Sequence, residues 1–372
     1  MNQTHCAFNP TPWLQRIAEE QAGEDDPVFR AGMFRGHRHW SGLVKPRPDD
    51  NIFYTASAVW IMQQCRPHWP ESAQALADTL MARAIQRYPD YRSRDGVPLF
   101  NFWRNFPPEP FPNGRLMRRF PKFILPDDFD DTSVIYLTAP EHRGDPGWYH
   151  DLAARHANGN AGWNQTALPR YRRLPTYSLW VGVRMPIEFD ACVMSNLLYW
   201  VCASGLPFNT YDRNGFFFLE DSLRRGFHAS EPLRTAPYYS RPAIILYHLT
   251  RLYAAFETPP NVAEVRLLLM RALQAQLLRR DLLWMDRLLL STSMMRLGGN
   301  PVVEVPPPGQ LEATGWRDFV WISASMLGLS AHPLGRRLAP WQKVFFTLTC
   351  PAFALVLMLE HETLKSRLIK EA

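Results

Sequence analysis

Residues 127–137 of the chain read DDFDDTSVIYL, with four aspartates in the first five positions and a mostly apolar run behind them. A helix that is apolar around its whole circumference must be buried. Its first N–H groups have no partner within the helix, so a polar start must cap them or face a cavity. This stretch therefore predicts a buried helix whose N-terminal end is rich in carboxylates.

Other segments repeat this pattern of a polar start and an apolar continuation. They are residues 49–62, 188–203, 238–252, 281–295 and 316–327. Amphipathic candidates stand between them, and the clearest are residues 71–87, 148–157, 215–227 and 261–280. Six buried helices that alternate with amphipathic outer helices are typical of an (α/α)6 toroid. We therefore expect an all-α fold of that class.

No Gly/Ser-rich linker or block of like charge divides the chain of 372 residues. We expect one toroid domain over residues 1–372, with an N-terminal extension and the first outer helix in residues 1–48. Residues 300–313 contain three consecutive prolines and are expected to form a loop, because proline cannot continue a helix. The first ten residues are polar, and the longest apolar run is shorter than a membrane-spanning helix requires. These features predict a cytoplasmic protein with at most peripheral membrane contact.

The bulk composition narrows the classes of partner. The formal net charge is +6, but the basic residues are scattered and match no nucleic-acid-binding module, so no nucleic-acid partner is expected. The five cysteines are widely spaced and form no CxxC pair, which argues against structural zinc or disulfides. Aromatic residues make up 13% of the chain and exceed what an ordinary core needs. We expect part of this excess to serve a pocket.

The toroid pattern predicts where that pocket lies. Inner helices of a toroid run parallel, so their N-terminal ends gather at one mouth, and Asp130 would face a cavity there. The aromatic candidates for its wall are Phe53, Tyr54, Trp60, Trp103, Tyr199, Trp200, Tyr238, Tyr239 and Trp316. The charged candidates are Arg184, Glu188, Asp190 and Arg241.

Clustered carboxylates at residues 127–131 point to proton transfer. Repulsion and partial burial make at least one of them hold its proton more readily than a free aspartate. A general acid that works at neutral pH needs this property. A helix N-terminus has the opposite effect, because it favours the charged carboxylate. The sequence leaves open which effect is larger.

The string Asp128-Phe129-Asp130-Asp131-Thr132 resembles the DxDD(T) motif of class II terpenoid cyclases of the squalene–hopene cyclase type. The resemblance implies an α/α toroid in which Asp130 protonates an alkene or epoxide. It implies that Asp128 and Asp131 tune or orient this acid, and that aromatic faces stabilise the carbocation. The family usually has two helical domains and repeated QW motifs, whereas this chain has room for one domain and shows no evident QW repeat.

Other interpretations remain open. Asp127, Asp128 and Asp131 also have DDxxD spacing, which is similar to the magnesium-binding motif of class I prenyl synthases and would imply Mg²⁺ with a diphosphate substrate. No other cofactor is expected. An α/α-toroid carbohydrate hydrolase or lyase would pair Asp130 with Glu188 or Asp190. A non-catalytic toroid would bind a lipid or a partner protein. We favour a cyclase-like enzyme with an apolar small-molecule substrate and leave its oligomeric state open.

Overall fold

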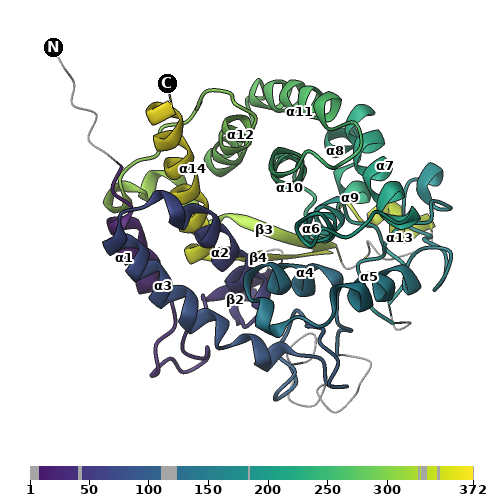
Figure 1. The fold of residues 1–372 in the computed structure, drawn as a ribbon, viewed down its shortest axis with the longest axis horizontal. Coiled ribbons are helices and arrows are strands. Elements are labelled where there is room, and N and C mark those ends of the chain that lie inside the picture. Colours follow the sequence, from purple (N-terminus) through teal and green to yellow (C-terminus); the bar gives the residue numbers. More distant parts are fainter. Residues whose placement is uncertain are drawn as a thin grey trace.

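The computed structural model of the chain describes residues 8–40, 44–109, 124–182, 185–325, 327, 333–341 and 344–371. Most of these residues lie in helices, but four strands form an antiparallel sheet as well. The prediction of an all-α toroid is therefore wrong, and the protein is a mixed helix-and-sheet structure (Figure 1).

A ring of helices forms the centre of the molecule (Figure 1). In chain order its members are α2 (Ile52–Cys65), α4 (Phe129–Thr138), α6 (Ala191–Ala203), α10 (Pro242–Ala255), α12 (Trp284–Arg296) and α14 (Pro351–Glu371). Each helix contacts the next, and α14 contacts α2, so the ring is closed. Helix α2 shows why these helices are central, because almost all of its side chains are buried on every face.

A second group of helices lies outside this ring. It comprises α1 (Thr11–Glu20), α3 (Glu71–Ile85), α5 (Pro146–Arg155), α7 (Thr210–Arg224) and α11 (Val262–Leu277). These helices bury one face, as α11 does with Val265, Leu269 and Leu273 at steps of four residues. Three short helices complete the helical part of the described chain: α8 (Phe227–Ser230), α9 (Pro232–Thr235) and α13 (Pro333–Leu338).

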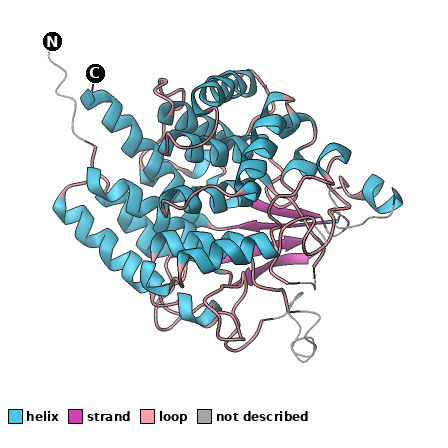
Figure 2. Cartoon of the chain, turned by 45° about the vertical axis from the view of Figure 1, so that its right-hand side comes forward, coloured by secondary structure: helices cyan, strands magenta, loops and turns pink. Residues whose placement is uncertain are grey.

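The sheet joins the two ends of the described chain. Its strand order is β2-β1-β4-β3, with β1 at Gly36–Trp40, β2 at Val44–Asp49, β3 at Val320–Ser325 and β4 at Phe345–Thr349. The central pair, β1 and β4, is antiparallel, with His37 opposite Thr349 and Trp40 opposite Phe346. Figure 2 shows the strands gathered beside the helices on one side of the molecule.

The predicted sixth inner helix at residues 316–327 is wrong. The chain there makes a 3-10 turn at Trp316–Asp318 and then strand β3. Val320, Trp321 and Ile322 are β-branched or aromatic residues, which suit the pleated surface of a sheet. The sixth place in the ring belongs to α14, which begins at Pro351 directly after β4. No helix in the described ranges combines the length and apolarity needed to cross a membrane.

The sheet covers the end of the ring where several inner helices begin. Isolated backbone bridges connect Asn51, the N-cap of α2, with Trp103, and Asp128, the N-cap of α4, with Trp180. A further bridge joins Tyr239, just before α10, to Ser323 of β3. These links place helix N-termini and strands around one shared space.

Candidate active site

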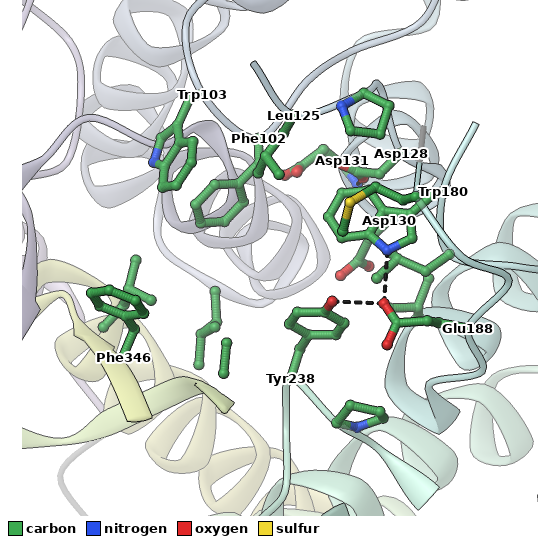
Figure 3. A pocket seen from close by; sticks show the side chains of 18 of the residues that line it. Phe102, Trp103, Leu125, Asp128, Asp130, Asp131, Trp180, Glu188, Tyr238 and Phe346 are labelled. Carbon is green, nitrogen blue, oxygen red and sulfur yellow. Dashed lines mark hydrogen bonds between the residues drawn. The ribbon is translucent and has the colours of Figure 1, made fainter. Parts of the chain in front are cut away.

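A cavity of about 530 Å³ lies between the helix N-termini and the sheet (Figure 3). Its wall comes from the start of α4, the segments before α6 and α10, and strands β1, β3 and β4. Most of the lining is aliphatic or aromatic. The described side chains on its wall that can ionise are Arg38, Asp128, Asp130, Asp131, Glu188, Tyr238 and Tyr239.

Asp130, in the first turn of α4, is buried and held by two hydrogen bonds. Its Oδ1 accepts from Asn196 Nδ2 at 2.6 Å, and its Oδ2 accepts from the Tyr239 hydroxyl at 2.5 Å. Burial raises the pKa of Asp130, and these two bonds and the charge of Arg251 only partly oppose it. Asp130 therefore holds a proton more readily than a free aspartate.

Asp128 and Asp131 flank Asp130 and are also buried. Asp128 caps α4 through a hydrogen bond from the Asp131 backbone N–H to its Oδ1 at 2.8 Å. Burial and the nearby charge of Asp130 raise the pKa of Asp128 to about 8. Burial and the charges of Asp128 and Asp130 raise the pKa of Asp131 as well. For Asp128 and Asp131, burial and mutual repulsion thus act against the helix N-terminus, and the pKa of both groups is raised.

Asn196 contacts Asp130 directly, and Arg251 contacts it through Asn196. Arg251 of α10 donates to Asn196 Oδ1 at 2.6 Å, so the amide nitrogen of Asn196 is the group that faces Asp130. The Arg251 guanidinium carbon lies 3.7 Å from the centre of the Trp60 ring. Sequence reasoning missed both residues, although a polar side chain within an otherwise apolar inner helix is a signal that could have found them.

Glu188 is a further carboxyl on the cavity wall, as Figure 3 shows. Its Oε2 accepts from Trp180 Nε1 at 2.8 Å and from the Tyr238 hydroxyl at 2.7 Å. Burial raises the pKa of Glu188 to about 7, and the two hydrogen bonds oppose that shift. Glu188 therefore exists in both protonation states near neutral pH.

Asp190, two residues further on, has a different role. It caps α6 by accepting from the backbone N–H groups of Cys192 and Val193, at 2.8 and 3.3 Å, and from that of Tyr238 at 2.9 Å. Burial raises its pKa to about 8. The Asp190 carboxyl is not on the cavity wall, and its contacts fix the backbone.

Among the described residues that line the cavity, Arg38 of β1 carries the only positive charge. Its Nη1 lies 3.7 Å from Asp49 Oδ2, and its guanidinium carbon is 5.7 Å from the ring centres of Trp103 and Phe346. Sequence reasoning missed Arg38 because the strand that carries it was not predicted.

Three of the nine predicted aromatics line the cavity, namely Trp103, Tyr238 and Tyr239. Phe53 lies behind Tyr239, with ring centres 5.6 Å apart. Tyr54 does not line the cavity, but its hydroxyl donates to the backbone carbonyl of Leu348, a residue of the wall, at 2.8 Å.

The other predicted aromatics pack elsewhere. Trp60 and Tyr199 contact each other with ring centres 4.8 Å apart, and Trp200 packs against Tyr149 at 4.6 Å. Trp316 is covered by the guanidinium of Arg317. Trp60, Tyr199 and Trp200 lie in the second half of their helices and do not line the cavity.

Phe102, Trp180 and Phe346 line the cavity and were missed by sequence reasoning. Phe102 and Trp180 lie in irregular segments and Phe346 lies in β4. Helical periodicity carries no information about such positions, so the sequence held no signal that could have found them.

Two of the remaining predicted groups, Arg241 and Asp127, do not line the cavity. Arg241 forms an ion pair with Asp286, and Arg184 lies outside the described residues. Asp127 is half-buried and its Oδ1 accepts from Asn101 Nδ2 at 3.4 Å. In the part of the chain that the structure describes, no three His, Cys, Asp or Glu side chains are grouped so that they could hold a metal ion.

Comparison with known proteins found no family model, no curated protein and no solved structure that matches this chain. The resemblance to class II cyclases therefore remains a prediction carried by residues 128–132. The chemistry of the cavity is therefore the remaining basis for a proposed function.

Proposed function

We propose that the protein is an enzyme that protonates an apolar, isoprenoid-like substrate and then isomerises or cyclises it. The observation that carries this proposal is the cluster of three buried carboxyls, Asp128, Asp130 and Asp131, on the wall of a largely apolar cavity. An alkene is a weak base, and its protonation requires an acid that keeps its proton until the substrate is in place.

Asp130 is the proposed acid, with Asp128 and Asp131 as its neighbours. A carboxyl group has about four lone-pair positions, so the contacts of Asp130 with Asn196 and Tyr239 leave room for an acid hydrogen that points into the cavity. Burial, the largest cause of the raised pKa of Asp128, favours a neutral carboxyl beside Asp130. A neutral neighbour makes it easier for Asp130 to lose its proton to the substrate.

The rest of the cavity suits a carbocation better than a sugar. The rings of Trp180 and Tyr238 lie on the wall and can stabilise positive charge, whereas the rings of Trp103 and Phe346 already have the Arg38 guanidinium beside them. An apolar wall also offers few hydrogen-bond partners to water, which would otherwise quench the cation. Sugar hydroxyls would find few partners on this wall, and an unpaired buried polar group is costly. The carbohydrate alternative therefore has less support.

The proposed setting is the cytoplasm, with the apolar substrate as the partner and no nucleic acid. The free thiols of Cys65, Cys192, Cys202 and Cys350 support a reducing compartment.

The test is incubation of the purified protein with geranyl, farnesyl and geranylgeranyl diphosphates and with squalene, each with and without Mg²⁺. We expect a cyclised or isomerised product from the natural protein. Asp130→Asn should lower turnover by about 10²–10⁴-fold, the usual contribution of a general acid. Asp145→Asn is the control, because Asp145 is likewise an aspartate at the start of a helix, α5, but lies outside the cavity wall.

Three other outcomes would each change the proposal in a different way. Unchanged turnover in Asp130→Asn would exclude Asp130 as the acid. Turnover that requires Mg²⁺ and is abolished in Asp127→Asn would favour the DDxxD interpretation. Cleavage of oligosaccharides without any action on isoprenoids would reject the proposal in favour of a carbohydrate-active enzyme.

A further inference from the structure

Glu188 differs from Asp128 and Asp190, two other buried acids near the cavity, in the kind of partner that its carboxyl has. Asp128 and Asp190 cap helices through backbone N–H groups. Glu188 is bonded only to side chains, those of Trp180 and Tyr238. Both hydrogen bonds end on Oε2, so among the described residues Oε1 has no hydrogen-bond partner. Glu188 is therefore a buried carboxyl that no helix start requires.

The partners of Glu188 form an aromatic corner of the cavity. The rings of Trp180 and Tyr238 meet edge to face, with centres 5.9 Å apart and planes at 86°. Both rings and the Glu188 carboxyl lie on the cavity wall (Figure 3). Aromatic faces and a carboxylate both attract positive charge. This corner is consequently the part of the wall best suited to a cation.

Other ionisable groups surround this corner from the neighbouring elements. Asp128, Asp130 and Asp131 face the same cavity from α4, Tyr239 faces it from the segment before α10, and Arg38 faces it from β1. Asp190 is close in sequence, but its carboxyl is directed to backbone N–H groups. The cavity thus presents one buried acid cluster and one separate carboxyl.

We propose that Glu188 is the proton acceptor that ends the reaction, while Trp180 and Tyr238 stabilise the cation before it is quenched. This inference rests on the proposed function. A C–H bond next to the cationic carbon breaks, and its electron pair forms the new C=C bond. The proton moves to Glu188 Oε1. The substrate gains one proton from Asp130 and loses one to Glu188, so the overall reaction is an isomerisation. Exchange with solvent then returns both carboxyls to their starting states.

Glu188→Gln tests this role without disturbing the local contacts. A glutamine carbonyl oxygen can accept both hydrogen bonds that now reach Oε2, but an amide cannot take up the proton. We expect the variant to begin the reaction, because Asp130 is intact. Its main products should change from the deprotonated alkene to water-quenched or incompletely cyclised species. Formation of the alkene should fall by on the order of 10²-fold, the lower range for loss of a general base.

The pH profile provides a second readout. In the natural protein, alkene formation should rise with pH through about 7 as Glu188 becomes ionised. Glu188→Gln should lose this limb of the profile. Glu220→Gln is the matched control, because Glu220 is also buried and accepts from a tyrosine, Tyr253, but does not line the cavity. Its product ratio and pH profile should match those of the natural protein.

A cation mimic separates failure of this inference from failure of the proposed function. N,N-dimethylfarnesylamine, which is protonated at neutral pH, should bind more tightly at pH 8 than at pH 6. It should lose at least about tenfold in affinity in Glu188→Gln but not in Glu220→Gln. Product formation that is identical in Glu188→Gln and the natural protein would overturn the role of Glu188 alone. Absence of turnover with every isoprenoid would overturn the proposed function, and amine binding unaffected by Glu188→Gln would then reject the cation-facing corner too.

Discussion

Two groups of buried charges in the inner ring are built in opposite ways. Where α12 meets α14, Arg296 is paired with Glu360, which also accepts from the Tyr247 hydroxyl at 2.7 Å. Burial lowers the pKa of Arg296, but the charges of Glu360 and Tyr247 together raise it by more, so Arg296 stays charged. At the start of α4, Asp128 and Asp130 lie together instead, and burial raises the pKa of each.

The two groups therefore suit different roles: the ion pair suits a structural role, and the carboxyl cluster suits proton transfer. A buried ion pair contributes to holding two helices in place, and each charge depends on its partner. Two buried carboxyls that lie close together cannot stabilise the fold in this way, because each is tolerated there only while it keeps its proton and is neutral. A buried carboxyl whose pKa is raised at a cost to stability is therefore a candidate for a functional residue. Three predictions test this contrast.

The largest effect is expected where the ion pair is broken. Arg296→Met should lower the free energy of unfolding by about 3–5 kcal/mol, because it leaves Glu360 buried without its partner. The double variant Arg296→Met/Glu360→Leu should recover most of this loss, since no uncompensated charge remains. Urea unfolding monitored by circular dichroism provides the measurement. A loss below about 1 kcal/mol in the single variant would contradict the assigned role.

A smaller effect of opposite sign is expected at Asp128. Its pKa is about 8 in the folded state against an ordinary value of 3.8, so the folded protein binds more protons between these pH values. Stability must then fall as pH rises across this window. Asp128→Asn keeps the helix cap. It should flatten this decline and be more stable than the natural protein at pH 8 by at least about 1.4 kcal/mol, the equivalent of one pKa unit.

Thermal unfolding at pH 4 and at pH 8 measures this difference. At pH 4 the two proteins should have nearly equal stability, because Asp128 is then protonated in the folded state. Asp145→Asn is the control and should keep the pH dependence of the natural protein, since Asp145 caps the outer helix α5. Parallel profiles for Asp128→Asn and the natural protein would show that Asp128 is ionised throughout.

The smallest effect is expected at Tyr199, which packs on Trp60 away from the cavity wall. Tyr199→Phe removes one hydrogen bond, from Gln64 Nε2 at 3.1 Å, and should lower stability by about 0.5–1.5 kcal/mol. Its products and pH profile should be those of the natural protein. Tyr238→Phe is the informative partner variant, because it removes a donor to Glu188 and should move the pH limb upward. A product change in Tyr199→Phe would show that the cavity extends further than its described wall.

The sequence predicts the inner helices better than it predicts the sheet that covers one end of their ring. Residues 52–62, 191–203 and 242–252 have the all-round apolar pattern, and each lies within an inner helix, α2, α6 or α10. Strands β1 (GHRHW) and β2 (VKPRPD) show no simple alternation of apolar and polar residues. The two strands pair with each other, but β1 also pairs with β4, which is remote in sequence, so a local pattern cannot predict the sheet that they belong to.

The same limit applies to the site. The carboxyls of Asp128, Asp130 and Asp131 were predictable as a group, because one short segment carries them all. Arg38 and Trp180 reach the cavity from a strand and an irregular segment, whose positions are set by tertiary contacts. The local motif thus predicts the acid, whereas the other residues of the cavity wall are brought to it only by the tertiary structure.

The sheet also constrains the order in which the protein is completed. His39 of β1 and Thr349 of β4, joined by a side-chain hydrogen bond of 3.0 Å, are 310 residues apart in sequence. Closing so long a loop has an entropic cost, and contacts of this kind slow folding. During synthesis, β1 leaves the ribosome long before its partner strand exists. The cavity wall therefore stays incomplete until residues 320–349 have been translated, because β3 and β4 supply five of its residues: Ile322, Ala324, Ser325, Phe346 and Leu348.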